Sequence, residues 1–196
     1  MKKLSEKEIR FLCDTDFLLT KQEINRKISA LLGEAEQKLK SVIKASDFPF
    51  PNQTFLKAAK ISRGEQYRGL PYWVLDYPRK FSKEATFSFR TLIWWGHEIS
   101  CFLHLGGTDL EKFRPLILEN LRSDPDQFIA VNSSPWEYHF EADNYKRVTE
   151  IDPQALDKHM STHHFHKMIY QLPLEDLGNL PDFASHTFAK IISKLH

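Results

Sequence analysis

The chain has 196 residues, 41% of them hydrophobic and 27% charged, and this length is enough to bury a substantial core; we predict one domain over residues 1–196. A formal net charge of +1 gives no electrostatic reason to expect nucleic acid or a membrane surface as a partner. The two cysteines, Cys13 and Cys101, argue against a disulfide framework, and we expect a cytoplasmic protein.

Two helices are predicted in the first part of the chain. The segments SEKE at residues 5–8 and TKQE at residues 20–23 both have the spacing of a capping box. The first opens a short helix to about Cys13, and the second opens a helix over residues 20–46 whose apolar residues recur at helical spacing. Charges interrupt the N-terminal segment too early for a signal peptide, and no stretch reaches the roughly 18 apolar residues of a membrane span.

The segment after these helices is predicted to be mostly loop. Residues 48–51, FPFP, end the long helix, because a residue that precedes proline avoids helical geometry. Residues 54–61 fit one or two helical turns, and the glycines and proline of residues 64–71 mark a loop. Residues 72–77, YWVLDY, predict a strand that Pro78 ends.

Residues 86–105, TFSFRTLIWWGHEISCFLHL, predict a β-hairpin, because both halves alternate with the period of a strand. A two-residue turn would place Phe89 beside His104 and mix the two faces. A three-residue loop at residues 95–97 aligns the apolar side chains on one face, since a shift of one residue turns every side chain to the other face. We therefore predict the three-residue loop. One face is then dry, and the other, the polar face, carries Ser88, Arg90, Trp94, Glu98, Ser100, Phe102 and His104.

Helices and strands are both predicted after the hairpin. The segment TDLE at residues 108–111 has capping-box spacing, and its helix is expected to kink or split at Pro115. The remaining elements are strands over residues 128–131, 136–141 and 165–172, a helix over residues 153–160 and a terminal helix from Pro181. This order predicts an α+β fold, a mostly antiparallel sheet with the helix of residues 20–46 and the terminal helix packed on its dry face.

The polar face of the hairpin is the leading candidate for a binding site. If the strand of residues 72–77 pairs beside it, Asp76 lies on the same side as Arg90. Arg79 and Arg90 would then contact an anionic group, while His104 would serve as a hydrogen-bonding or acid–base group and Trp94 as a wall of the pocket. This pattern predicts binding of a small anionic or aromatic ligand, identifies no cofactor and leaves open whether catalysis follows. The competing interpretation is an Arg90–Asp76 ion pair on a solvated sheet.

Histidines concentrate in the last third of the chain and suggest a second function. His164 and His166 have the spacing that places two imidazoles on one side of a strand. His139 lies on one side of another predicted strand, together with Glu137 and Glu141. If these sides met, the histidines and a carboxylate would hold a divalent transition metal, as in a metal-dependent enzyme. The sequence has no HExxH motif, so surface or hydrogen-bonded core histidines are the competing interpretation.

Trp94 and Trp95 at the tip of the hairpin suggest a third function. Exposed adjacent indoles would offer a contact to another protein. The tip is therefore a candidate surface for an oligomer, or for an interaction module without small-molecule chemistry. Trp73 and Trp136 are predicted to lie in the interior.

Overall fold

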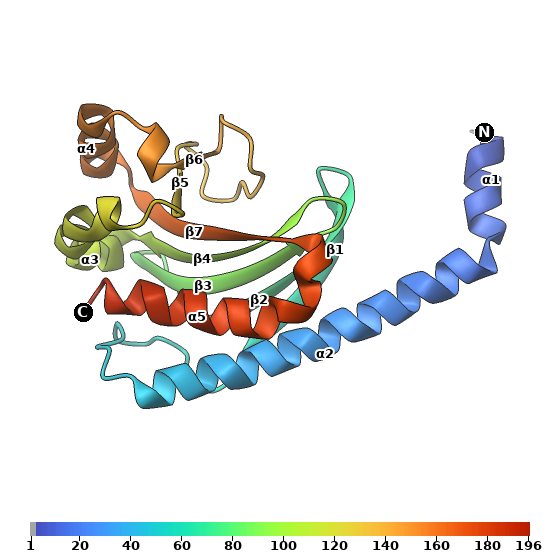
Figure 1. Cartoon of the computed structure of the whole chain (residues 1–196), viewed down its shortest axis with the longest axis horizontal. Coiled ribbons are helices and arrows are strands. Elements are labelled where there is room, and N and C mark those ends of the chain that lie inside the picture. The colour runs from blue at the N-terminus through green and yellow to red at the C-terminus, as the bar shows by residue number, and fades with distance from the viewer. Residues whose placement is uncertain (1–2) are drawn as a thin grey trace.

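The computed structural model describes residues 3–196 and contains a seven-stranded sheet whose neighbouring strands all run antiparallel, in the order β1-β2-β3-β4-β7-β5-β6 (Figure 1). The strands are β1 (Lys60–Tyr67), β2 (Leu70–Phe81), β3 (Ala85–Trp94), β4 (Glu98–Gly106), β5 (Phe128–Ala130), β6 (Tyr145–Arg147) and β7 (Phe165–Pro173). The helices are α1 (Glu6–Cys13), α2 (Thr15–Ala45), α3 (Gly107–Asn120), α4 (Pro153–Thr162) and α5 (Leu180–Ser193), with short 3-10 turns at Leu121–Ser123, Val148–Glu150 and Leu174–Asn179. The predicted α+β class is confirmed. Among the described residues, no helix combines the length and apolar character needed to cross a bilayer.

The three-residue hairpin loop is confirmed. In the β3–β4 pair, Ile93 lies opposite Ile99 and Arg90 lies opposite Phe102, which leaves residues 95–97 as the loop. Gly96 has φ +76°, a left-handed conformation that favours glycine. The register therefore separates the apolar side chains from the polar face as the alternation of the sequence requires.

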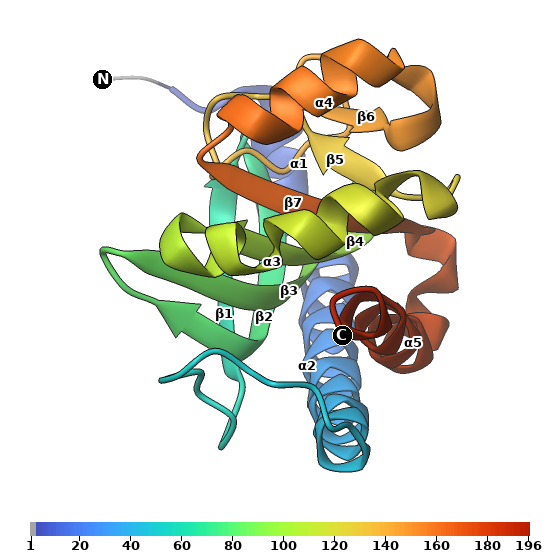
Figure 2. The same cartoon turned by 90° about the vertical axis from the view of Figure 1, so that its left-hand side faces the viewer.

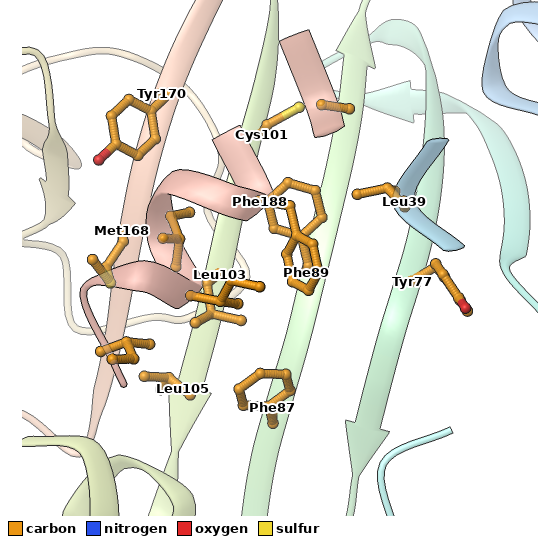
Figure 3. Close-up of a cluster of buried hydrophobic side chains, with 14 of the residues drawn as sticks. Leu39, Tyr77, Phe87, Phe89, Cys101, Leu103, Leu105, Met168, Tyr170 and Phe188 are labelled. Carbon is orange, nitrogen blue, oxygen red and sulfur yellow. The ribbon is translucent and has the colours of Figure 1, made fainter. Parts of the chain in front are cut away.

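The dry face of the sheet carries the main core. Helices α2 and α5 lie side by side beneath it, and α3 packs on β3 and β4 (Figures 1 and 2). Figure 3 shows Phe188 of α5 above Phe89 of β3, with ring centroids 4.9 Å apart. Leu103 of β4 and Leu39 of α2 are fully buried in the same cluster. The predicted packing of the long and terminal helices is therefore present.

Helix α2 begins five residues earlier than predicted, at Thr15. The side chain of Asp14 accepts a hydrogen bond from the backbone N–H of Phe17, so Asp14 is the N-cap and Thr20 lies inside the helix. The capping box of Ser5 and Glu8 at the start of α1 is confirmed. The buried residues of α2 begin at Ile28, and its polar contacts with the sheet begin at Lys21, which pairs with Glu65 of β1.

Strand β1 was not predicted, and β2 is longer than predicted. The sequence KISRGEQY of β1 is mostly exposed at the edge of the sheet, so it lacks the apolar alternation that identifies a half-buried strand. β2 continues past Pro78 because the β2–β3 register shifts between Asp76 and Arg79, and an irregularity of this kind tolerates proline.

The start of α3 differs from the predicted capping box. Gly107, at φ +57°, is the first helical residue, and a Cβ atom there would lie 1.9 Å from the carbonyl oxygen of Glu84. The backbone N–H of Thr108 donates to that same oxygen, so the Thr108 side chain does not cap the helix. α3 runs as one helix through Pro115, which is exposed.

Residues 136–141 are not a strand. They belong to a loop between β5 and β6 that lies across the polar face, tied at its end by the Asn144 amide, which donates to the carbonyl oxygen of His139 at 2.7 Å. Trp136, predicted to be interior, is 56% exposed on this loop, whereas Trp73 is buried as predicted. Polar residues at the start of the loop, such as Asn132 and Ser134, make local turns instead of a ladder.

Candidate functional site

The polar face is largely enclosed. Under the β5–β6 loop lies a second apolar cluster, which is built from β2, β3, β4, β5, β6 and β7. Its buried members are Val74, Leu92, Phe102, Ala130, Tyr145, Phe165 and Ile169. Polar side chains on this face are therefore removed from bulk water, and each needs a partner within the protein.

Arg90 and Asp76 form a bidentate ion pair on this face, as adjacent strands β2 and β3 place them opposite each other. Arg90 Nε donates to Asp76 Oδ1 at 2.7 Å, and a second guanidinium nitrogen donates to Oδ2 at 2.9 Å. Their side chains are only 15% and 6% exposed. Burial opposes the charged form, but the hydrogen bonds and charge of Asp76 raise the pKa of Arg90 above its ordinary value. The ion pair is therefore present but buried, and the competing prediction that it is exposed to solvent is wrong.

A pocket of about 180 Å³ opens beside this ion pair, and we call it the tyrosine pocket. It is lined by Ser62, Tyr67, Tyr72, Val74, Arg90, Leu92 and Tyr138. The Tyr67 hydroxyl is fixed, because it donates to Glu137 at 3.1 Å and accepts from the backbone N–H of Tyr138 at 2.7 Å. Burial raises the pKa of Tyr67 to about 12.

The Tyr138 hydroxyl is the polar group of the tyrosine pocket that is best placed to bind a ligand. It accepts a hydrogen bond from Arg90 Nη1 at 2.6 Å, which leaves its own proton for another acceptor. Burial raises the pKa of Tyr138, so the hydroxyl is protonated at neutral pH. Tyr138 lies on the covering loop, where the alternation of residues 136–141 predicts a strand and gives no sign of the contact with Arg90.

Lys167 of β7 is fully buried behind the tyrosine pocket and was not predicted as a site residue. Its ammonium donates to the carbonyl oxygen of Glu137 at 2.8 Å and to the Tyr145 hydroxyl at 3.2 Å. It also lies 4.6 Å from the centroid of the Tyr138 ring and 5.2 Å from that of Phe102. Burial and the nearby Arg90 cation lower the pKa of Lys167 to about 7. The only signal in the sequence is a lysine on the same side of the strand as Phe165 and Ile169.

The stability of the protein should rise above pH 7 because of Lys167. Its folded pKa of about 7 is below its ordinary value of 10.5, so between these values the unfolded chain binds one more proton than the folded chain. The free energy of unfolding therefore increases with pH across this window, by roughly 2–4 kcal/mol. Lys167→Met should remove this increment, measured as the difference between wild-type and variant urea unfolding at pH 7, 8 and 9. Parallel curves for the two proteins would contradict the lowered pKa.

The structure separates His104 from the tyrosine pocket. His104 is buried beside Phe165 and Trp136 and lines a different hollow, of about 290 Å³, near Thr86. Burial, with the Lys167 and Arg90 cations, lowers its pKa to about 3, so the imidazole is neutral at physiological pH. His104 is therefore not placed to exchange protons with a ligand next to Arg90.

Arg79 and Trp94 also lie outside the tyrosine pocket. Arg79 donates to the carbonyl oxygen of Ala58 at 2.6 Å and stacks over the Phe55 ring. Trp94 is 3% exposed and stacks on His97 with centroids 3.6 Å apart, so the prediction of two exposed indoles at the tip is wrong. Of the five predicted site residues, the structure brings together Asp76 and Arg90.

The three predicted metal ligands do not converge. His166 faces the dry side of β7, because it alternates with Lys167 on the polar side, and His164 is exposed near Thr86. His139 lies on the covering loop. Within residues 3–196, the one group of potential ligands with metal-like spacing is His139, Glu141 and Asp143. Arg68 already provides the positive charge that a metal ion would bring to this group. It lies 3.2 Å from His139 Nε2 and 3.6 Å from Glu141.

Comparison of the chain with protein-family models, with curated proteins and with solved structures finds no match.

Proposed function

We propose that the tyrosine pocket binds a small, planar, uncharged ligand that carries a hydrogen-bond acceptor. The observation that carries this proposal is the Tyr138 hydroxyl, which is held by Arg90 at 2.6 Å in the wall of a pocket lined by three tyrosines. Aromatic walls with a few fixed polar groups are typical of small-molecule sites. Of the two predicted kinds of ligand, anionic and aromatic, we retain the aromatic one.

The charge balance of the pocket favours a neutral ligand over an anion. Both oxygens of Asp76 accept from Arg90, so the guanidinium is already paired with a carboxylate. An anion would have to displace Asp76, leaving that carboxylate buried without its partner. A neutral acceptor such as a carbonyl oxygen instead takes the Tyr138 proton and leaves the ion pair intact.

The size of the pocket sets the size of the ligand. A volume of about 180 Å³ is close to the roughly 150 Å³ of an apolar cavity that holds benzene, so one substituted ring fits. Wider hollows, such as one of about 400 Å³ lined by Phe128, Tyr170 and Lys190, are more open to solvent.

We propose binding without catalysis for this pocket. Burial raises the pKa values of the Tyr67 and Tyr138 hydroxyls in its wall, so neither hydroxyl supplies a base at neutral pH. A cytoplasmic location is part of the same proposal, supported by the two free thiols of Cys13 and Cys101.

Binding of benzamide and benzoate, two rings that differ in charge, tests the proposal. Titration monitored by protein NMR should show benzamide shifting signals of Tyr67, Tyr72 and Tyr138, with benzoate binding more weakly. Tyr138→Phe keeps the ring but removes the hydroxyl and should weaken benzamide binding about 5- to 10-fold. The matched control is Tyr77→Phe, which removes a hydroxyl bonded to the Leu56 carbonyl oxygen elsewhere. Stronger binding of benzoate, or equal loss in both variants, would contradict the proposal.

A further inference from the structure

The N-terminal arm, residues 3–24, projects beyond the sheet (Figure 1) and touches it through the ion pair of Lys21 with Glu65 of β1. None of the described residues of α1 is buried. Eight large apolar side chains of the arm are between 36% and 63% exposed. They are Leu4, Ile9, Phe11, Leu12, Phe17, Leu18, Leu19 and Ile24. On the rest of the described chain six large apolar side chains are exposed, and two of these, Phe55 and Phe81, line one hollow at the end of β2.

The exposed apolar area of the arm is the size of a protein interface. A large apolar side chain presents about 200 Å² when fully exposed, so eight that are half exposed leave on the order of 800 Å², summed over all sides of the arm. A monomer typically carries a largest apolar patch of only about 300–600 Å². About 800 Å² per partner is what a stable complex of standard size buries.

An apolar stripe runs along one side of the arm and is interrupted by Lys21, which pairs with Glu65 of β1 at 3.3 Å. Phe17 and Ile24 are seven residues apart in α2, which places them on the same side of the helix. The Phe11 ring of α1 contacts the Phe17 ring, with centroids 5.5 Å apart, and extends the stripe onto the first helix. A stripe of this spacing is suited to pack against another helix.

The charges of the arm favour a second copy of this chain as the occupant. Residues 3–24 carry four basic and five acidic side chains, so the arm attracts neither nucleic acid nor an anionic surface. In an antiparallel pair centred between Thr20 and Lys21, Phe17 of one copy lies beside Ile24 of the other. The same arrangement places Asp14 opposite Lys27, and both contacts occur twice by symmetry.

We propose that the N-terminal arm is the interface of a homodimer, in which two copies pack antiparallel along the first half of α2. This moves the expected oligomer contact from Trp94 and Trp95 to the arm, since Trp94 is buried in its own chain. The proposal is independent of the tyrosine pocket, which lies on the sheet.

Sedimentation velocity of the full chain tests the interface. The wild type, of 23.0 kDa per chain, should sediment as a dimer when its concentration is raised to about 100 µM. Phe17→Ser with Ile24→Ser should weaken the dimer by on the order of 100-fold or more, because each substitution acts twice. Circular dichroism at high concentration should show both proteins folded. The matched control is Leu118→Ser on α3, another exposed leucine, which should leave the dimer intact.

A spin label on Cys13 tests the antiparallel direction, since Cys13 is exposed and Cys101 is buried. Two labels in the antiparallel pair lie roughly 20–25 Å apart, given the rise of about 1.5 Å per residue in a helix. A monomeric wild type, a dimer unaffected by the double variant, or Cys13 residues close enough to form a disulfide would each overturn the proposal.

Discussion

Arg90→Met should lower the free energy of unfolding by about 3–5 kcal/mol, the largest effect we expect from a single substitution on the polar face. The variant leaves the Asp76 carboxylate buried without its cation and removes the donor that holds the Tyr138 hydroxyl at 2.6 Å. For a chain of this length, the melting temperature should fall by roughly 6–20 °C. Urea and thermal unfolding, followed by circular dichroism, measure both quantities.

An exposed ion pair and a double variant serve as controls for this result. Arg26 and Glu23 form a pair with 70% and 46% exposed side chains, and Arg26→Met should leave the free energy of unfolding nearly unchanged. Asp76→Leu combined with Arg90→Met removes both buried charges and should recover much of the loss. A double variant no more stable than Arg90→Met would show that the loss does not come from an unpaired carboxylate.

Phe89→Ala should destabilise the protein by about 3–5 kcal/mol, for a different physical reason. Phe89 is fully buried on the dry face, and its ring packs on Phe188 of α5 at 4.9 Å, so truncation leaves a cavity between sheet and helix. The measurement is the urea unfolding midpoint with the slope held equal to that of the wild type.

Phe81→Ala is the control for the core substitution. Phe81 is at the end of β2 and is 46% exposed, so its truncation should cost less than about 1 kcal/mol. Equal losses at Phe81 and Phe89 would contradict the assignment of Phe89 to the core. Because Phe89 and Arg90 are neighbours on one strand, the two large effects together test which face each side chain occupies.

The position of the candidate site follows from the hairpin register, which gives the sheet two different faces. The dry face takes the helices, and the polar face is closed by residues 131–144. Closing that face removes Arg90 and Lys167 from water and creates the tyrosine pocket between β1, β2, β3 and the loop. The pocket is therefore a product of the covering loop as much as of the hairpin.

Local patterns in the sequence were sufficient to predict the hairpin loop, the first capping box and the helix that starts at Pro153. In each case the determining contacts lie within a few residues: Ser5 caps with Glu8, and Asp152 accepts from the N–H groups of Gln154 and Ala155. The alternation of residues 86–105 likewise keeps the apolar side chains on one face only if the loop has an odd number of residues.

Only the tertiary structure decided the edge strand β1, the covering loop and the site itself. Arg90 meets Tyr138 from 48 residues away, and Lys167 meets Glu137 from 30 residues away. β1 carries no regular apolar pattern because it is a mostly exposed edge, and the alternation of residues 136–141 predicts a strand where side-chain hydrogen bonds hold a loop instead. The alternation of the sequence predicts which face Arg90 occupies and Asp76 of the neighbouring strand pairs with it, but the burial of Arg90 and its contact with Tyr138 depend on the distant loop that covers this face.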